Sequence, residues 1–186
     1  YLTVRRWHTD NCFELVHHVT FVGVRQPSFM GELGTPFIFG PVAGGEHAPW
    51  RLRTGFGWRG IIADAARDLA NWMVSFDPLM HRTFALADRI YVTSEQTRDL
   101  IPRCYRHKTS VQLAIAMEPI TDAASPASPE IPARPLRILY VGNFLYLKGM
   151  HLGLPAFAEM LEYFPSARLT MVGKGPDEAR WRRLAI

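Results

Sequence analysis

The apolar residues in the first part of the chain predict two short strands. The apolar, β-branched run over 13–22 predicts a buried strand, although two histidines interrupt it. A turn and a short helix through 29–30 follow, and the run 35–39 predicts a second strand that ends on Gly40-Pro41. Residues 41–49 form a loop with two adjacent glycines. A strand that leads into such a loop is where α/β proteins place ligands.

Helical periodicity begins at Arg59. Apolar residues then recur at positions that share one face of a helix. This face comprises Ile62, Ala65, Leu69, Trp72, Met73 and Phe76. Asp77 before Pro78 predicts a capped start for a second helix, which runs to Leu86.

A strand and a helix follow in the same alternating order. The short apolar run 89–93 predicts the strand. Thr93 with Gln96 three residues later predicts a capping box, which would start a helix over 94–101.

The composition changes sharply between Glu118 and Pro135. Proline, alanine and serine dominate this stretch and large apolar side chains are almost absent, which is typical of linkers between domains. We therefore expect three parts: an incomplete domain over 1–117, a linker over 118–135, and the start of a second domain over 136–186.

Beyond the linker, the pattern predicts a βαβα unit. Two buried strands, 137–141 and 168–172, flank a helix that begins near Met150 and carries Pro155 in its first turn. Gly175-Pro176 predicts the start of a further helix. This alternation produces a parallel sheet with right-handed crossovers, so the expected fold class is α/β.

Composition narrows the class of protein. At 48% hydrophobic residues, the chain suits a packed core rather than a disordered tail. No run reaches the roughly 18 uncharged apolar residues that span a bilayer, and the first ten residues lack the apolar block of a signal peptide. Cys12 and Cys104 fit neither a disulfide framework nor a metal motif, so we expect reduced thiols, no metal and a cytoplasmic location.

The charge pattern indicates the kind of partner. The formal net charge of +4 comes from arginines dispersed along the chain rather than from one dense tract. This distribution favours phosphate-bearing or anionic membrane partners over nucleic acid.

Two glycine loops at predicted strand ends are candidate phosphate sites. The loop from Gly142 to Lys148 offers backbone amides, a helix N-terminus and a lysine. The loop Gly173-Lys174-Gly175 is a weaker candidate. A tight strand-to-helix turn, with a solvated lysine, is the alternative for each loop, and the residues alone leave both interpretations open.

Several motifs together resemble the group 1, or family 4, glycosyltransferases over about residues 13–184. The motifs that resemble the donor domain are Leu139–Asn143, Lys148-Gly149, Ala156-Phe157 and Leu169–Pro176. The motifs that resemble the acceptor domain are Val16–Phe21, Pro36–Glu46 and Val92–Thr97. Their order and spacing are more specific than either glycine loop alone.

The resemblance implies a GT-B enzyme with two Rossmann-like domains, both incomplete here, and the active site between them. It implies retaining transfer, without metal or cofactor, from a UDP- or GDP-linked sugar to a glycan or lipid-linked acceptor in cell-envelope polysaccharide biosynthesis. Lys148 matches the family's diphosphate-contacting lysine, and the implied donor site also includes Gly142, Asn143 and Gly173. Asn143 stands where the family usually has an arginine, so this position offers hydrogen bonds without a charge.

On the acceptor side, many relatives have a histidine where this chain has Gly40-Pro41. The resemblance leaves as catalytic candidates Glu46, His47 and His18, and as the acceptor-side loop Gly40, Gly44 and Gly45. A structural hydrogen-bonding role for each histidine and an ordinary flexible loop are the alternatives.

Aromatic and basic residues suggest a membrane contact. Trp50, Trp58 and Trp72, with neighbouring arginines, suit a peripheral contact with the anionic inner face of a membrane. The alternative is that Trp72 belongs to the core and that the arginines are solvated.

The sequence thus predicts a hexosyltransferase of which this chain is an internal fragment. The family's acidic donor motif would follow Ile186 and its first glycine loop would precede Tyr1, so we expect no transfer activity from the 186 residues alone. A non-catalytic binding or scaffold subunit is one alternative, favoured by Asn143 and the missing histidine. A GT-B sugar-nucleotide epimerase is another, although the Gly-x-Gly-x-x-Gly fingerprint is absent.

Overall fold

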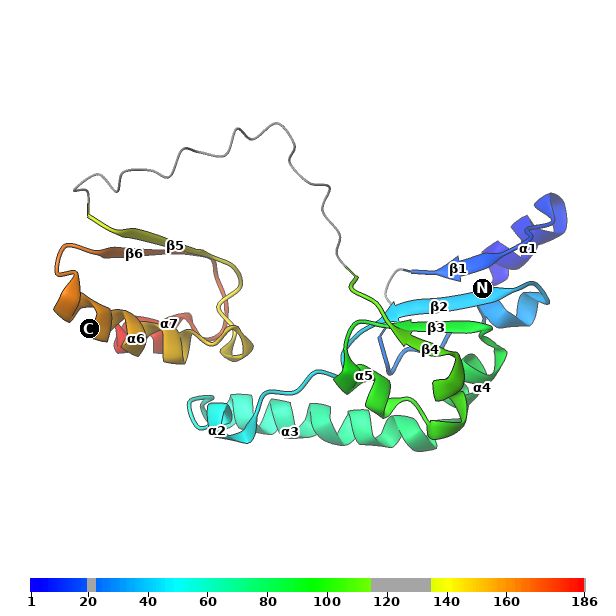
Figure 1. The fold of residues 1–186 in the computed structure, drawn as a ribbon, viewed down its shortest axis with the longest axis horizontal. Helices are drawn as coiled ribbons and strands as arrows, with labels where there is room; N and C mark the ends of the chain where they lie inside the picture. Colours follow the sequence, from blue (N-terminus) through cyan, green and yellow to red (C-terminus); the bar gives the residue numbers. More distant parts are fainter. Residues whose placement is uncertain (20–22, 115–134, 186) are drawn as a thin grey trace. The chain divides into compact units, whose positions relative to one another are not determined.

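The computed structural model describes residues 1–19, 23–114 and 135–185 (Figure 1). The chain divides into two compact units, Tyr1–His47 with Asp64–Met117, and Ala48–Ala63 with Glu118–Ile186. Each unit contains a parallel sheet with helices packed on it, so the predicted α/β class is confirmed in a form compatible with Rossmann-like folds. The predicted linker over 118–135 lies outside the described residues except for Pro135.

The sheet of the first unit has four parallel strands in the order β1-β2-β3-β4. These strands are Val16–His18, Phe37–Val42, Arg89–Val92 and Thr109–Val111. The two central strands bury apolar side chains, and Phe37, Phe39 and Ile90 are fully buried. Helix α4 (Pro78–Leu86) covers them with Phe84, so the core of this unit lies between the sheet and α4.

The first two predicted strands differ from the observed ones. β1 covers only three residues of the predicted 13–22 and is half exposed, because it is an edge strand with a single neighbour. Residues 20–22 lie outside the described residues. β2 does not end on Gly40-Pro41 but continues to Val42. The register with β3 shifts between Phe39 and Val42, and such a bulge accommodates a proline within a strand.

Local capping chemistry sets the helix starts of the first unit. Asp77 caps α4 and Pro78 occupies its first position, as predicted. Helix α5 (Glu95–Leu100) is capped by Ser94 and not by Thr93, so the predicted capping box is wrong by one residue. The remaining helices of this unit are α1 (Leu2–Asn11), η1 (Met30–Leu33), η2 (Val74–Phe76) and η3 (Arg103–Lys108). The sequence pattern did not predict α1 or β4.

Helix α3 (Trp58–Met73) turns its apolar face outward. Trp72 is 61% exposed and Phe76, just beyond the helix, is 68% exposed, whereas Asp64 and Asn71 are buried. The interpretation of Trp72 as a core residue is therefore wrong. Periodicity identifies which residues share a face but not what that face packs against, and here the polar side of the helix packs inward.

The second unit has a two-stranded parallel sheet, with α6 and α7 on the same side of it (Figure 1). Its elements are α2 (Trp50–Arg53), β5 (Arg137–Val141), η4 (Tyr146–Lys148), α6 (Met150–Tyr163), β6 (Arg168–Val172) and α7 (Glu178–Leu184). The predicted βαβα order is confirmed. The predicted burial of the strands is wrong, since Leu139 and Val141 are 65% and 69% exposed on the face that no described helix covers.

Two helix boundaries of this unit also differ from the prediction. Pro155 is the sixth residue of α6 and therefore lies beyond its first turn. Helix α7 begins at Glu178, two residues after Pro176, and no side chain caps it. Both helices nevertheless pack on the sheet, because Met150, Leu154 and Trp181 form the core with Phe144.

Residues 48–63 complete the core of the second unit from a distant part of the sequence. Phe56 is 3% exposed, and its ring centroid lies 4.8 Å from that of Tyr146 and 5.3 Å from that of His151. Nε2 of His151 also lies within hydrogen-bond distance, 3.2 Å, of the carbonyl oxygen of Leu52. These contacts hold α2 and the turn before α3 against η4 and α6.

Candidate functional site

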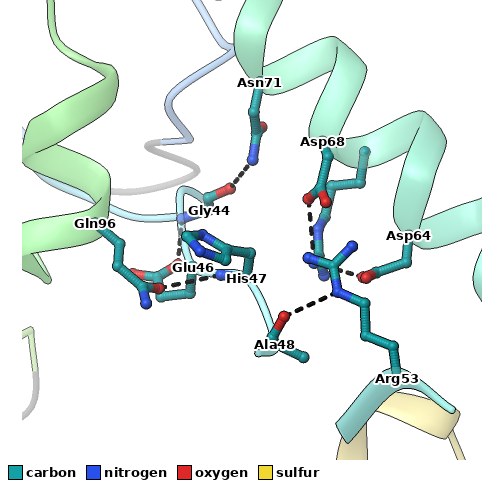
Figure 2. A network of polar contacts seen from close by, with 10 residues as sticks. Gly44, Glu46, His47, Ala48, Arg53, Asp64, Asp68, Asn71 and Gln96 are labelled. Carbon is teal, nitrogen blue, oxygen red and sulfur yellow. Dashed lines mark hydrogen bonds and ion pairs between the residues drawn. The ribbon is translucent and has the colours of Figure 1, made fainter. Parts of the chain in front are cut away.

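The loop that follows β2 closes around the carboxylate of Glu46 (Figure 2). Oε1 accepts hydrogen bonds from the hydroxyls of Thr93, Ser94 and Thr97 at 2.9, 2.8 and 3.0 Å, and Oε2 accepts one from the amide of Gly44 at 2.9 Å. The three hydroxyls come from the end of β3 and the start of α5. Because β2 and β3 are parallel neighbours, the loop and the hydroxyls meet at the carboxyl edge of the sheet.

Two opposing influences set the pKa of the Glu46 carboxyl. Burial is the largest and raises the pKa, but the hydrogen bonds from Ser94, from Thr93 and from the amides of Glu46 and Gly44 together outweigh it. The pKa falls from 4.5 to about 2. A carboxylate with so low a pKa stays ionised at neutral pH and is a weak base. Glu46 is therefore suited to a structural role, in which its carboxylate holds the loop after β2 in place.

Hydrogen bonds from the loop backbone to the side chains of Asn71 and Gln96 fix the rest of this loop. Nδ2 of Asn71 donates to the carbonyl oxygen of Gly44 at 2.9 Å, and the amide of His47 donates to Oε1 of Gln96 at 3.1 Å (Figure 2). Gly45 is buried, and a Cβ there would lie 2.5 Å from Cα of Thr97. Gly45 thus allows a close approach of the loop to α5, and the loop is ordered by packing.

Gly40 has a different structural reason to be glycine. It lies inside β2 with φ +128°, and a Cβ there would lie 2.2 Å from the carbonyl oxygen of Tyr91. This contact brings β2 close to β3 just before the Glu46 loop. Gly40 therefore shapes the strand that carries the loop.

The candidate histidines occupy unlike environments. His18 ends β1, and its Nδ1 lies 2.9 Å from Oγ of the buried Ser28, so the ring is held inside the unit. His47 extends from the loop beside Glu46 and is exposed. All three catalytic candidates follow or end parallel strands, at the carboxyl edge of the sheet. His18 fits the structural alternative, whereas the exposed ring of His47 can reach a ligand.

The donor-side glycine loops contact each other at the carboxyl ends of β5 and β6. The amide of Gly142 donates to the carbonyl oxygen of Val172 at 3.0 Å, and the amide of Phe144 donates to the carbonyl oxygen of Lys174 at 2.9 Å. A Cβ at Gly173 would lie 1.9 Å from the carbonyl oxygen of Gly142. The two loops predicted as separate phosphate candidates therefore form one backbone-lined edge.

Two polar residues flank this edge. The backbone carbonyl of Asn143 accepts a hydrogen bond from the hydroxyl of Tyr140 at 3.1 Å, which fixes the first loop. Lys148 ends η4 and is exposed, and among the described residues it has no ion-pair partner. Its ammonium group is thus available to bind an anion.

Sequence reasoning assigned no role to the residues that hold Glu46 and its loop, although Val92–Thr97 is one of the acceptor-like motifs. Thr93, Ser94 and Thr97 appear in the sequence as a hydroxyl-rich turn after a strand, and Asn71 appears as a polar position on a helix with an apolar face. A hydroxyl cluster after the strand next to the glycine loop is the signal that could have identified them. Each lies 27 to 51 residues from its partner in the loop, so only the packing of distant elements joins them.

The described residues contain no group of three or more histidine, cysteine, aspartate or glutamate side chains arranged to hold a metal ion. Within the same residues, no helix has the length and apolar character needed to cross a membrane. Cys12 and Cys104 are free and exposed. Comparison of the chain with protein-family models and with curated proteins finds no match.

Proposed function

We propose that this chain is part of a retaining glycosyltransferase of the group 1, GT-B type, which transfers a hexose from a UDP- or GDP-linked sugar to a glycan or lipid-linked acceptor. One observation carries the proposal. The loops at Gly142 and Gly173 contact each other at the carboxyl edge of a parallel sheet, with the exposed Lys148 following the first loop. Parallel α/β sheets bind phosphate-bearing ligands at this edge.

The chemistry of the reaction needs such an edge. A nucleoside diphosphate leaving group gains negative charge as the glycosidic bond breaks, and cationic side chains and backbone amides stabilise that charge. Lys148 supplies the cation in this proposal, and the loops at Gly142, Asn143 and Gly173 supply polar backbone. Asn143 adds a hydrogen-bonding side chain in place of the family's arginine.

On the acceptor side, the proposal assigns different roles to two neighbouring residues. Glu46 holds the loop, since its carboxylate accepts four hydrogen bonds and has a pKa of about 2. His47 presents its exposed ring to the acceptor from that loop. A peripheral contact with the inner face of a membrane would bring lipid-linked acceptors to the same protein.

A non-catalytic binding or scaffold subunit is the second candidate. The saturated carboxylate of Glu46 favours it, because a weak base at the acceptor side contributes little to proton transfer. Asn143 favours it as well, since the donor site then has one positive charge fewer.

Nucleotide binding tests the donor site directly. We expect UDP or GDP to bind the chain in calorimetric titration, and Lys148→Gln to weaken binding about tenfold or more, since hydrogen bonds to charged groups contribute about 1.5 to 3 kcal/mol. Arg182→Gln is the matched control, because Arg182 pairs with Glu178 and is not in the proposed donor site. Absence of binding by either nucleotide, or equal binding by Lys148→Gln, would reject the proposal.

Turnover then separates the two candidates. A transferase should release UDP or GDP from a panel of nucleotide sugars when an acceptor is added to a longer protein that carries this chain and the family's acidic donor motif. A scaffold subunit binds the nucleotide without such release.

A further inference from the structure

A cavity lies within the second unit, between the start of α3 and helix α7. It has a volume of about 560 Å³. One wall, from the start of α3, includes Trp58, Arg59 and Gly60, and the other, from α7 and the residue before it, includes Asp177, Arg180 and Arg183. Neither Lys148 nor the glycines of the proposed donor edge line it. The cavity is therefore separate from the residues on which the proposed function rests.

The two walls are tied together by Arg180. Its guanidinium donates to the carbonyl oxygen of Gly55, in the turn before α3, and lies 4.0 Å from the carboxylate of Asp177. The ring of Phe56, packed on Tyr146, anchors the same turn. Both walls are thus attached to the core of the unit.

Positive charge dominates the cavity. Three arginines line it against one acid, Asp177, which is the ion-pair partner of Arg180. Arg59 and Arg183 are exposed and have no ion-pair partner among the described residues. Two guanidinium groups in the lining, one from α3 and one from α7, therefore have no compensating carboxylate.

The backbone adds to this charge. Helix α3 is 16 residues long and has no acidic residue in its first turn. The first backbone hydrogen bond of the helix runs from the amide of Ile61 to the carbonyl oxygen of Gly57. The amides of Trp58, Arg59 and Gly60, which line the cavity, come before it and have no partner within the helix. Free amides and the positive end of the helix dipole favour an anion at this position.

From these observations we infer that this cavity binds the phosphate group of a ligand. Guanidinium groups bind phosphate oxygens in a bidentate manner, and here two of them line one cavity together with an uncompensated helix N-terminus. Trp58 is 68% exposed at the rim, and the guanidinium of Arg59 lies 5.1 Å from the centroid of its ring. This pair offers an apolar surface to the rest of the ligand. The phosphate belongs either to a soluble molecule or to a lipid headgroup.

The test uses the 186-residue chain with Lys148→Gln as background, which removes the cation of the proposed donor site. Inorganic pyrophosphate is titrated and followed through the NMR signals of the arginine side chains. We expect the signals of Arg59 and Arg183 to shift. The double variant Arg59→Gln, Arg183→Gln should bind pyrophosphate at least about tenfold more weakly, given the strength of charged hydrogen bonds. The matched control is Arg51→Gln, Arg182→Gln, which removes the same charge outside the cavity and should bind within about twofold of the background chain.

Vesicles distinguish the two sources of phosphate. Flotation compares phosphatidylglycerol vesicles with phosphatidylcholine vesicles for the same variants, and circular dichroism confirms that each variant is folded. Binding of pyrophosphate alone assigns a soluble ligand, and binding of phosphatidylglycerol that the cavity variant loses assigns a lipid headgroup. If neither probe binds, or if the cavity and control variants lose binding equally, the inference is overturned.

Discussion

Nδ2 of Asn71 donates a hydrogen bond to the carbonyl oxygen of Gly44, 2.9 Å away. The donor comes from the inward side of α3 and the acceptor from the loop after β2. Asn71 is 4% exposed, so this contact lies inside the first unit. One side chain thus connects the buried polar side of α3 to the loop that carries the acceptor-side candidates.

Replacing Asn71 should destabilise the first unit. We expect Asn71→Ala to lower the free energy of unfolding by about 1 to 2 kcal/mol, because it removes a part-buried hydrogen bond of a buried side chain and leaves a small void. Urea denaturation measures the change. The control is Asn11→Ala on the exposed helix α1, where the expected change is within about 0.5 kcal/mol. Equal losses from both variants would contradict the structural role of Asn71.

The low pKa of Glu46 predicts a specific pH dependence of stability. The folded-state pKa is about 2 and the reference value is 4.5, so the folded protein favours the ionised form. The stabilisation is present above the reference pKa and is lost as the pH falls from about 5 toward 2. Glu46→Gln should flatten the unfolding free energy across this window, whereas Glu162→Gln, at an exposed position of α6, should leave the slope unchanged.

Two glycine substitutions should change stability in opposite directions. A Cβ at Gly45 would lie 2.5 Å from the backbone of Thr97, so we expect Gly45→Ala to cost about 1 to 3 kcal/mol. A Cβ at Gly153, in α6, would meet only the flexible side chain of Met150, with its sulfur at 3.2 Å. Gly153→Ala should therefore stabilise the chain by about 0.5 to 1 kcal/mol through helix propensity. Thermal unfolding followed by circular dichroism compares the two, and a similar shift in both would refute the expected contrast.

The exposure of Trp72 on α3 predicts that its loss costs less stability than the loss of a core residue. Trp72 is 61% exposed and contacts Phe76 edge to face, with ring centroids 5.0 Å apart. We expect Trp72→Ala to cost only about 1 kcal/mol, the size of one aromatic pair. Phe84→Ala removes a fully buried ring and should cost about 3 to 5 kcal/mol. Comparable losses for the two variants in urea denaturation would show that Trp72 is a core residue after all.

The sequence predicted features that depend on neighbouring residues. Asp77-Pro78 predicted the start of α4 correctly, because a cap and the helix that it starts are adjacent in the chain. The strand-helix-strand order of 137–172 was predicted for the same reason, since apolar runs and their breaks are local signals.

Features that depend on the packing of distant elements were missed. Asn71, on the inward face of α3, bonds to Gly44 in a distant loop, and the hydroxyls of Ser94 and Thr97 reach Glu46 only once β3 lies beside β2. The apolar content of β5 and β6 suggested burial, but burial also needs an element on each face of the sheet. The motif therefore located the loop that carries Glu46, but the hydrogen-bond partners of Glu46 could not be predicted from the sequence.

The insertion of residues 48–63 into the second unit has a consequence for biosynthesis. During translation, the segment around Phe56 leaves the ribosome well before Tyr146 and His151, the residues that cover its ring. The second unit cannot complete its core until those later residues are made, so its folding waits for a long-range closure, a step that is slow compared with local helix formation. Until then Phe56 is an uncovered aromatic side chain, available to a chaperone.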